Sequence, residues 1–517
     1  MRYLVNGREM KEIDMRSIHD YGIPSLVLME RAALEVAKEA ERLMELKKMH
    51  VSAGKGVIWS VCGLGNNGAD GAAAARILHL RGYTAVIILP SVDDRMSKEM
   101  EIQLSIAEKL GIPIHRLDDL IPGVCDMVID AVFGIGLTRP VEGAYAELME
   151  LINTQREEFG AKVVSVDIPS GISSECGGVL GCAVRADATV TFGEMKIGHV
   201  LFPGRQYSGT VTVADIGFVP VDEEAAKTYV RTHTKEDLMN IPKRAAYSHK
   251  GNYGKILVVA GAKNMAGAAY FAAKAAYRTG AGLVKVLTAE ENRTVIQEKL
   301  PEAILATYST ECSSHEQVEF KDYIRNQTDW ADVIILGPGI GTEEYSRVMV
   351  EAVLEYAYVP IILDADAINL AARYPYLKKF FTENLILTPH LSECSRLTGK
   401  TVDEIRETLV ETAREVSEQY GVTCVLKDAA TVIARKDGKV FVNMSGSSAM
   451  AKGGSGDVLS GVIAGLLGLG MDECEAASLG VYIHGLAGEA AARKFGVHSV
   501  LAGELADFIG EVINETV

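Results

Sequence analysis

The sequence predicts an α/β protein built from two layered α/β domains. Two long blocks of the 517-residue chain alternate short apolar runs with helix-like segments, the pattern of parallel strands joined by helices. Each block also has its own glycine-rich loops at the ends of apolar runs. We therefore expect one domain over residues 1–220 and another over 244–517, separated at 221–243 by a charged linker that includes a helix leading into the second domain.

The first block begins its sheet at residues 55–90, "KGVIWSVCGLGNNGADGAAAARILHLRGYTAVIILP". This stretch predicts a strand, a glycine loop, an Ala-rich helix and a second, parallel strand. Further strands are expected in "CDMVIDAVFGIG" and "AKVVSVDIPSG", each followed by a polar loop. Ligands of open α/β sheets bind at the carboxyl ends of the strands, so these loops are the expected binding sites.

The second block repeats this pattern with different loops. Strands are expected in "GKILVVAGA", "GLVKVLT", "ADVIILGPGIG", "VPIILDADAINL" and "NLILTPH", in this order. The stretch "VTCVLKDAATVIARKDGKVFVN" predicts another strand and a hairpin that turns at Lys436-Asp437-Gly438. It leads directly into a glycine-rich turn and an apolar helix.

The composition indicates a cytoplasmic protein. Hydrophobic residues make up 48% and charged residues 23% of the chain, as in globular proteins. The net charge of −17 argues against nucleic acid or an anionic membrane as a partner. The eight cysteines include no CxxC pair, the first residues contain no apolar signal segment, and no uncharged apolar run reaches the ~20 residues that span a bilayer.

Gly63, Gly65 and Gly68 form a GxGxxG pattern between a predicted strand and a predicted helix, as in dinucleotide-binding domains. That pattern also requires an acidic residue about 20 positions later, at the end of the second strand. Pro90 and Ser91 occupy this place, and Asp93 follows them. A dehydrogenase is therefore disfavoured, although Asp93 keeps it open.

Asp457 lies where the glycine-rich turn in "AKGGSGDVLSGVIAGLLGLG" meets the apolar helix. As an N-cap, the aspartate would satisfy free N–H groups of the first helical turn. A cap does not require Gly453, Gly454 and Gly456, which allow the backbone to approach a ligand closely. Since a helix start of this kind holds anions, the alternatives are a helix cap and a catalytic carboxylate beside a phosphate site.

Polar oxygens follow three strands of the first block. Asn67 follows the first strand, Asp130 ends the next, and Asp167 and Ser170 follow the third. Asparagine in such loops is also a common turn former. Amide and hydroxyl oxygens around one carboxylate suit a hard cation of low charge.

Two ordered sets of motifs support a resemblance that covers nearly the whole chain. "LMERAA", "GLGNNGADG", "DAVFGIG" and "VDIPSGI" resemble the NAD(P)H-hydrate epimerase domain. "HKGNYGKILVVAG", "LGPGIG", "LDADAINL", "LTPH", "LKDAATVI" and "GGSGDVLSGVIAG" resemble the ADP- or ATP-dependent NAD(P)H-hydrate dehydratases, a ribokinase-like family. The pair resembles the bifunctional NAD(P)H-hydrate repair enzymes, which implies a Rossmann-like three-layer first domain and a ribokinase-like second domain.

For the first domain, the resemblance implies that Asp167 is catalytic and that Asn67, Asp130 and Ser170 bind a potassium ion. Ala69 departs from the family, which usually has a glycine there. The residues implied to contact the hydrated cofactor are Asn66, Asn67, Gly68, Ala69, Asp70, Gly134, Ile135, Gly136, Leu137, Thr138, Arg139, Pro140 and Asp167.

For the second domain, the resemblance implies that Asp457 is catalytic. Asp428 stands where relatives commonly have glycine. The implied substrate site consists of Ala268, Gly339, Gly341, His390 and Asp457, within which Gly339 and Gly341 belong to the loop 337–341. The implied nucleotide site consists of Lys427, Asp428, Ala429, Ala430, Thr431 and Gly456.

The implied function is repair of hydrated NADH and NADPH (NADHX and NADPHX). The first domain would interconvert the R and S hydrates, and the second would dehydrate the S hydrate with ADP, or alternatively ATP, as phosphoryl donor. Potassium and magnesium ions are the implied metals, and a homo-oligomer is expected. The rival hypothesis is a ribokinase-like small-molecule kinase with a non-catalytic first domain, since the "GGSGD" turn also serves such kinases.

Overall fold

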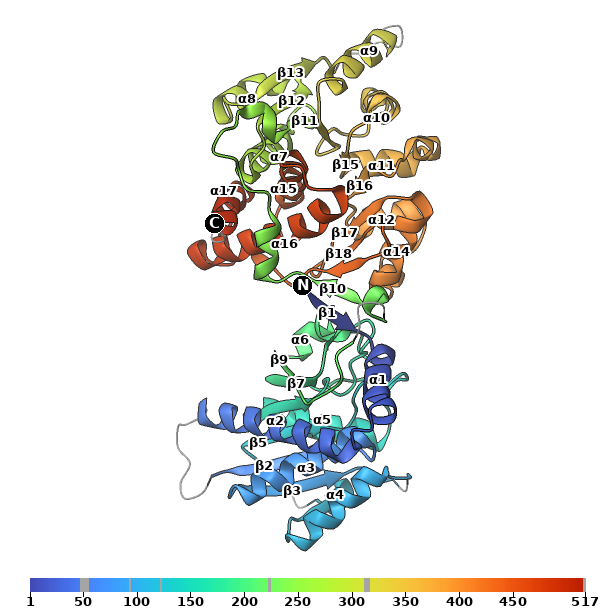
Figure 1. Ribbon diagram of the computed structural model, residues 1–517, viewed down its shortest axis with the longest axis vertical. Coiled ribbons are helices and arrows are strands. Elements are labelled where there is room, and N and C mark those ends of the chain that lie inside the picture. Colours follow the sequence, from blue (N-terminus) through green and yellow to red (C-terminus); the bar gives the residue numbers. More distant parts are fainter. Residues whose placement is uncertain (47–54, 93, 121–122, 222–224, 311–316, 515–517) are drawn as a thin grey trace. The chain divides into compact units, whose positions relative to one another are not determined.

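The computed structural model describes residues 1–46, 55–92, 94–120, 123–221, 225–310 and 317–514 (Figure 1). The chain divides into two compact units. We call Tyr3–Tyr229 the N-terminal unit, and Val230–Val517 together with Met1–Arg2 the C-terminal unit. Within the described residues, no helix combines the length and apolar character that a membrane span requires.

The segment predicted as a linker with a helix contains short elements instead. It includes a 3-10 turn at Ala225–Thr228, strand β10 (Val230–Thr232) and a second 3-10 turn at Lys235–Asn240. The second turn ends at Ile241, whose φ of −63° and ψ of 126° are extended. Pro242 follows and disfavours helical backbone at the residue before it, so an α-helix cannot continue here.

The N-terminal unit is built on a parallel sheet. Within its described residues the strand order is β4-β3-β2-β5-β6-β7-β9, and every neighbouring pair is parallel. The order reverses between β2 and β5, and such a reversal opens a crevice at the carboxyl ends of the strands. The strands are β2 (Val57–Cys62), β3 (Thr84–Leu89), β4 (Ile114–Arg116), β5 (Met127–Ala131), β6 (Lys162–Val166), β7 (Ala188–Phe192) and β9 (Thr210–Ala214).

Apolar side chains alternate across this sheet and form a separate core on each face. In β2, Ile58 packs with α2, α3 and α4 on one face, whereas Trp59 and Val61 pack with α5 on the other. The unit therefore has three layers and the predicted Rossmann-like fold (Figure 1). Its helices are α1 (Gly7–Met15), α2 (Ser25–Leu46), α3 (Asn66–Leu80), α4 (Lys98–Lys109), α5 (Ala144–Glu157) and α6 (Gly204–Tyr207), with a π-helix at Arg16–Asp20.

β1 (Arg2–Val5) and β8 (Met195–Lys196) form a short pair of strands that is not part of this sheet. The two strands run parallel, with Leu4 opposite Met195 and Val5 opposite Lys196. This pairing brings the start of α1 and the lysine of β8 to the same part of the N-terminal unit.

The C-terminal unit has a second sheet, in which strands β13-β12-β11-β14-β15-β16-β17 run parallel. β18 and β19 add an antiparallel hairpin, as predicted, and β10 pairs with β19. The strand order reverses between β11 and β14. The strands are β11 (Lys255–Val259), β12 (Leu283–Ala289), β13 (Ile304–Tyr308), β14 (Val333–Leu336), β15 (Ile361–Leu363), β16 (Leu385–Leu387), β17 (Thr423–Leu426), β18 (Val432–Ala434) and β19 (Val440–Val442).

Helix α15 (Ser455–Gly468) is almost wholly buried and packs closely on α7 (Ala266–Thr279). A Cβ at Gly461 would lie 2.3 Å from the carbonyl oxygen of Ala272, so only glycine permits this approach. This packing fixes the start of α15 at the carboxyl ends of the strands. The other helices are α8 (Arg293–Lys299), α9 (Gln317–Thr328), α10 (Glu344–Tyr356), α11 (Asp366–Arg373), α12 (Leu391–Thr398), α13 (Val402–Glu407), α14 (Leu409–Tyr420), α16 (Glu473–Phe495) and α17 (Ala502–Asn514).

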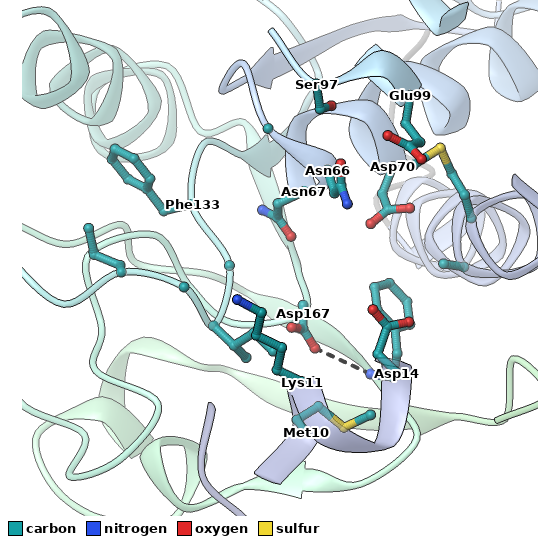
Figure 2. A pocket seen from close by; sticks show the side chains of 18 of the residues that line it. Met10, Lys11, Asp14, Asn66, Asn67, Asp70, Ser97, Glu99, Phe133 and Asp167 are labelled. Carbon is teal, nitrogen blue, oxygen red and sulfur yellow. Dashed lines mark hydrogen bonds between the residues drawn. The ribbon is translucent and has the colours of Figure 1, made fainter. Parts of the chain in front are cut away.

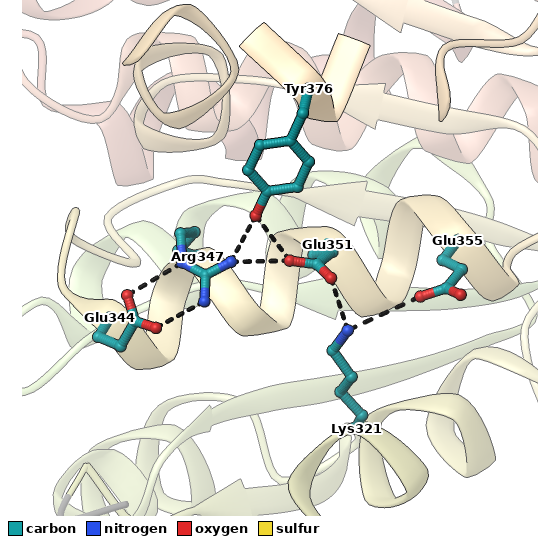
Figure 3. A network of polar contacts seen from close by, with 6 residues as sticks. All are labelled: Lys321, Glu344, Arg347, Glu351, Glu355 and Tyr376. Atoms are coloured by element: carbon teal, nitrogen blue, oxygen red, sulfur yellow. Dashed lines mark hydrogen bonds and ion pairs between the residues drawn. The ribbon is translucent and has the colours of Figure 1, made fainter. Parts of the chain in front are cut away.

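A polar network joins α10 to its neighbours (Figure 3). Glu351 of α10 accepts hydrogen bonds from Nζ of Lys321 at 2.6 Å and from the hydroxyl of Tyr376 at 2.7 Å. Arg347, one turn earlier, donates to Glu351 at 2.8 Å and also contacts the Tyr376 hydroxyl. One carboxylate therefore links α9, α10 and the 3-10 helix Pro375–Phe380.

Candidate functional site

The N-terminal unit contains a cavity of about 1010 Å³ at the carboxyl ends of its strands (Figure 2). This volume lies at the upper end of the roughly 300–1,000 Å³ that small-molecule sites occupy. Of the residues predicted to contact the hydrated cofactor, the cavity is lined by Asn66, Asn67, Asp70, Gly134, Ile135, Gly136, Leu137, Thr138, Arg139 and Asp167.

Three residues of the predicted contact set, Gly68, Ala69 and Pro140, do not line the cavity. A Cβ at Gly68 would lie 1.9 Å from the carbonyl oxygen of Gly63, so Gly68 allows the loop to close on itself. Ala69 is fully buried in α3, and Pro140 is exposed. Gly65 is the N-cap of α3, which gives the cavity the free N–H groups of a helix start.

Asp167 follows β6 and has a left-handed backbone, with φ at +68°. Its Oδ1 accepts hydrogen bonds from Lys196 at 2.6 Å and from Thr191 at 3.0 Å. Its carbonyl oxygen lies 2.9 Å from Nε2 of His199, whose pKa is lowered to about 4 chiefly by burial. A carboxylate held by several partners in a strained backbone has one defined orientation toward the cavity.

Asp70 and Asp14 face the same cavity as Asp167 (Figure 2). Burial raises the pKa of the Asp70 carboxyl well above its ordinary value, and the charges of Asp167 and Asp14 raise it further. Burial and the Asp167 charge likewise raise the pKa of Asp14, whereas His19 opposes the rise. Asp70 therefore keeps its proton to higher pH than an ordinary aspartate and can donate it.

The predicted potassium ligands Asp130 and Ser170 lie together beneath this cavity. Oδ1 of Asp130 accepts from Oγ of Ser170 at 2.5 Å, and Oδ2 accepts from Oγ of Ser165 at 2.7 Å. Burial raises the pKa of Asp130, although these hydrogen bonds lower it in part. The side chain of Asn67 lies close to the loop that follows β5, since a Cβ at Gly134 would lie 2.9 Å from Oδ1 of Asn67.

In the C-terminal unit, Asp457 is the third residue of α15, and its N-cap is Gly454, with φ at +91°. The simple capping role considered for Asp457 is therefore wrong, because another residue occupies the cap. Burial and the charges of Asp364 and Asp366 raise the pKa of Asp457 to about 6, against an opposing effect of Lys427. A carboxylate that gains a proton near neutral pH is suited to act as a base.

Asp364 and Lys427 form a buried ion pair next to Asp457. Nζ of Lys427 lies 2.8 Å from Oδ1 of Asp364, whose Oδ2 accepts from Ser460 of α15 at 2.7 Å. Burial lowers the pKa of Lys427, but its acidic neighbours, led by Asp364, raise it above the ordinary value overall. The residue after Asp364, Ala365, has φ at +50°, a conformation that alanine rarely adopts.

The predicted nucleotide residues follow β17 and lie beside the start of α15. A Cβ at Gly456 would be 3.4 Å from Nζ of Lys427, so this cation lies at the helix N-terminus. Asp428 and Ala429 are exposed, whereas Ala430 and Thr431 are buried. A lysine beside the free N–H groups of a helix start is a suitable anion site.

The predicted substrate residues of this unit come from the first turns of α7 and α15, the loop after β14 and the N-cap of α12. A Cβ at Gly339 would lie 3.0 Å from Cβ of Ala268, and the N–H of Gly341 donates to Asp366 at 2.9 Å. His390 is the N-cap of α12, where its Nδ1 accepts from the N–H of Ser392 at 3.1 Å, and half of its side chain is exposed. It pairs by a β-bridge with Lys427, which places the two predicted loops side by side.

Sequence reasoning missed three residues of these sites: Lys196, Asp14 and Asp364. Lys196 lies in the two-residue strand β8, and Asp14 lies on α1, far from the glycine loop in sequence. Neither is part of a loop after a strand of the parallel sheet, the signal on which the prediction rested. Asp364 directly follows the strand "PIIL" and could have been found by that signal.

Comparisons with known proteins match both units. The family model described as NAD(P)H-hydrate dehydratase matches residues 256–511, and that described as YjeF-related protein N-terminus matches residues 25–198. The bifunctional NAD(P)H-hydrate repair enzyme Nnr of Thermofilum pendens is 35% identical over 512 residues, which are 98% of this chain and 95% of that protein. The protein of the same name from Moorella thermoacetica is 34% identical over 526 residues, covering 99% and 96%.

A solved structure is also similar to the C-terminal part of the chain. The ADP/ATP-dependent NAD(P)H-hydrate dehydratase of Bacillus subtilis, co-crystallised with ATP and Mg²⁺, is 34% identical, with a TM-score of 0.49. The match covers 56% of this chain and 99% of that one.

Proposed function

Because the chain belongs to the family of bifunctional NAD(P)H-hydrate repair enzymes, we propose that its two units catalyse two successive steps on hydrated NADH and NADPH. The N-terminal unit epimerises the R and S hydrates in its cavity. The C-terminal unit dehydrates the S hydrate with ADP as phosphoryl donor, releasing AMP and phosphate. The observation on which this proposal rests most is Asp457 beside the start of α15, with Lys427 and Asp364 next to it.

The dehydration needs a better leaving group than hydroxide. In the hydrates a hydroxyl is bound to C6 of the nicotinamide ring. Asp457 takes the proton of this hydroxyl while its oxygen attacks the β-phosphoryl group of ADP, and the bond to AMP breaks. Phosphate then leaves C6 as the ring nitrogen supplies its lone pair, and loss of a proton from C5 restores the double bond of NAD(P)H.

Lys427 and the first N–H groups of α15 would hold the transferred phosphoryl group, with Gly456 leaving room for it. A magnesium ion fits this region, because Mg²⁺ is commonly held by one or two carboxylates together with substrate phosphates. Asp364 and Asp366 are the carboxylates close enough to Asp457 to raise its pKa. When bound, this ion would neutralise phosphate charge.

The epimerisation would depend on Asp167, which the resemblance assigns as catalytic and whose carboxylate faces the cavity. Its ion pair with Lys196 holds the carboxylate in one orientation, and Asp167 would accept a proton during the inversion at C6. The backbone N–H groups at the start of α3 and the side chains of Lys11, Arg95 and Arg139 would offer contacts to the pyrophosphate.

A potassium ion would be held by oxygens of Asn67, Asp130 and Ser170. The fit is supported by chemistry: one carboxylate among neutral oxygens suits a monovalent hard cation. The ligand atom of Asn67 would be Oδ1; its Nδ2, which is buried without a hydrogen-bond partner among the described residues, can donate only to an acceptor such as a bound substrate. When bound, the ion would order the loop that follows β5.

We propose that the protein is cytoplasmic and forms a homo-oligomer. A cytoplasmic location is supported by the free cysteines of the described chain, several of them buried. The homo-oligomer stays a prediction, which light scattering coupled to size-exclusion chromatography would test.

The proposed function is tested by incubating the full chain with a mixture of NADHX epimers, with ADP, with ATP or with no nucleotide. We expect NADH absorbance to return for both epimers only when a nucleotide is present, and faster with ADP. Chromatography should detect AMP and free phosphate. A stable phosphorylated product would instead indicate a small-molecule kinase, and regeneration without nucleotide would contradict the phosphoryl-transfer route.

A further inference from the structure

The N-terminal cavity contains acidic groups that the proposed reaction has not used. Asp70, in the first turns of α3, lines the cavity together with Asp14 of α1 and Asp167 at the end of β6. The three side chains point into one space from three different elements (Figure 2). Asp167 is paired with a buried lysine, whereas the charges that raise the pKa of Asp70 are those of the other two carboxylates.

We propose that Asp70 is the proton donor of the epimerisation, acting on the C6 hydroxyl while Asp167 serves as the proton acceptor. This inference rests on the proposed epimerase function and assigns the residue that makes the hydroxyl leave. The family resemblance gives Asp70 only as a substrate contact.

The two carboxyl groups have different surroundings. Nζ of Lys196 lies 2.6 Å from Oδ1 of Asp167, so a cation directly faces this carboxylate. Asp70 lines the same cavity as Asp167 and Asp14, and its pKa is raised most by burial and further by the charges of both. Asp14 is a weaker candidate, because His19 favours its charged form and only one carboxylate, Asp167, raises its pKa.

The chemistry balances with these two groups. Asp70 gives its proton to the C6 hydroxyl, the C6–O bond breaks with its electron pair on the departing water, and the lone pair of ring nitrogen N1 forms a C6=N1 double bond. C6 is then planar. Water adds to the opposite face and loses a proton to Asp167, and the double-bond electrons return to N1. Transfer of that proton from Asp167 to Asp70 through cavity water restores the starting state.

The charged groups around Asp70 define how its ionisation depends on pH. Among the described residues, Asp70 shares the cavity with four acidic side chains and with several cations, and the charges of Asp167 and Asp14 oppose its deprotonation. These groups are Lys11 and Asp14 on α1, Asp94 and Arg95 in the loop before α4, Glu99 on α4, Asp167 and Lys196. The epimerisation rate should therefore fall at high pH, as Asp70 loses its proton.

The test compares Asp70→Asn and Asp70→Glu in the full chain, with epimer exchange followed by chromatography across a pH series. An asparagine keeps a hydrogen-bond donor of the same shape but cannot transfer a proton, so the rate should fall by ~10²- to 10⁴-fold. Glutamate keeps the transferable proton and should be faster than asparagine. Dehydration of the S hydrate with ADP, in the other unit, should be unchanged, and a melting curve that keeps the wild-type transitions shows that the N-terminal unit of the variant is folded.

A second variant provides a readout that a structural role would not affect. Asp14→Asn removes one carboxylate that raises the pKa of Asp70, so the high-pH fall of the rate should move to lower pH. If the wild-type chain does not exchange epimers, the proposed function is wrong. If it does, but Asp70→Asn retains the wild-type rate and the same high-pH fall, Asp70 is not the donor.

Discussion

Nζ of Lys196 lies 2.6 Å from Oδ1 of Asp167, and the lysine side chain is fully buried. The same ammonium donates to the Thr191 hydroxyl at 2.8 Å and to the carbonyl oxygen of Phe192 at 3.0 Å. All three of its donors therefore have partners. A buried lysine is rarely tolerated unless it is paired in this way, and the pairing orients the proposed proton acceptor.

Replacing Lys196 by methionine should abolish epimerisation. The variant keeps the volume of the side chain but leaves Asp167 without its cation, so we expect a loss of at least ~10²-fold. Dehydration of the pure S hydrate by the same preparation should stay within twofold of the wild type, because the C-terminal unit has its own core. Epimer exchange that continues at the normal rate would contradict a role for the pair.

Asp457→Asn should separate catalysis from structure in the C-terminal unit. Asparagine cannot accept the hydroxyl proton, so dehydration should fall by ~10²- to 10⁴-fold. Nucleotide affinity should hold or rise, since one negative charge beside the phosphates is removed. Single-turnover dehydration and calorimetric titration with ADP measure the two effects. Near-normal dehydration would remove Asp457 as the base.

The same variant should be more stable than the wild type, in a manner that depends on pH. The pKa of Asp457 rises from 3.8 to about 6 on folding, so the folded state holds the proton more tightly. Its ionisation therefore costs stability fully above pH 6 and not at all below 3.8. We expect Asp457→Asn to gain ~1–3 kcal/mol at pH 8 and nothing at pH 3.5, measured from unfolding curves at each pH.

Gly68→Ala should prevent the N-terminal unit from folding. The added Cβ would lie 1.9 Å from the carbonyl oxygen and 2.7 Å from the carbonyl carbon of Gly63, and backbone atoms cannot move aside. Gly65→Ala is the matched control, because a Cβ there meets nothing within 4 Å. We expect a loss above ~4 kcal/mol for the first and below ~1 kcal/mol for the second, by chemical denaturation.

Glu351→Gln should destabilise the C-terminal unit by ~1–3 kcal/mol, because the carboxylate receives hydrogen bonds from three side chains and is largely buried. Burial raises the pKa of Glu351, but its partners lower it below 4.5 overall, so this stability is present above pH 4.5 and is lost as pH falls through the folded pKa. Glu355→Gln, whose carboxylate is 3.8 Å from Lys321 and more exposed, should cost little. Equal losses in both variants would contradict a special role for Glu351.

The sequence predicted the elements that lie in the middle of each sheet. Apolar runs such as "VIWSVC" and "VIIL" are nearly free of polar residues and are bounded by loops, so the hydrophobic pattern alone identifies these strands as buried. The pattern was less informative between the two units. For residues 221–243 it predicted a linker with a helix, and the structure has two 3-10 turns and the strand β10 in this segment. There the elements are short, and pairing of β10 with β19, more than 200 residues away, decides the conformation.

The site was predictable where its residues follow strands of the parallel sheet and unpredictable elsewhere. Asp167 and Asp457 each follow a motif at a strand end or helix start, and the structure places Asp167 in the cavity wall. Lys196 gave no signal, because a lysine in a short segment is exposed far more often than buried. Only the three-dimensional pairing of β1 and β8 identifies its neighbours.

Left-handed backbone at non-glycine residues is confined, within the described part of the chain, to Asp167, Asn264 and Ala365. Each lies in a loop that follows a strand of a parallel sheet: Asp167 after β6, Asn264 between β11 and α7, and Ala365 after β15. Such a conformation costs about 1–3 kcal/mol per residue, which the packed cores must offset. Selection for thermal stability alone would therefore favour glycine at these positions. Glycine would also make these loops more flexible, and turnover depends on their defined conformation.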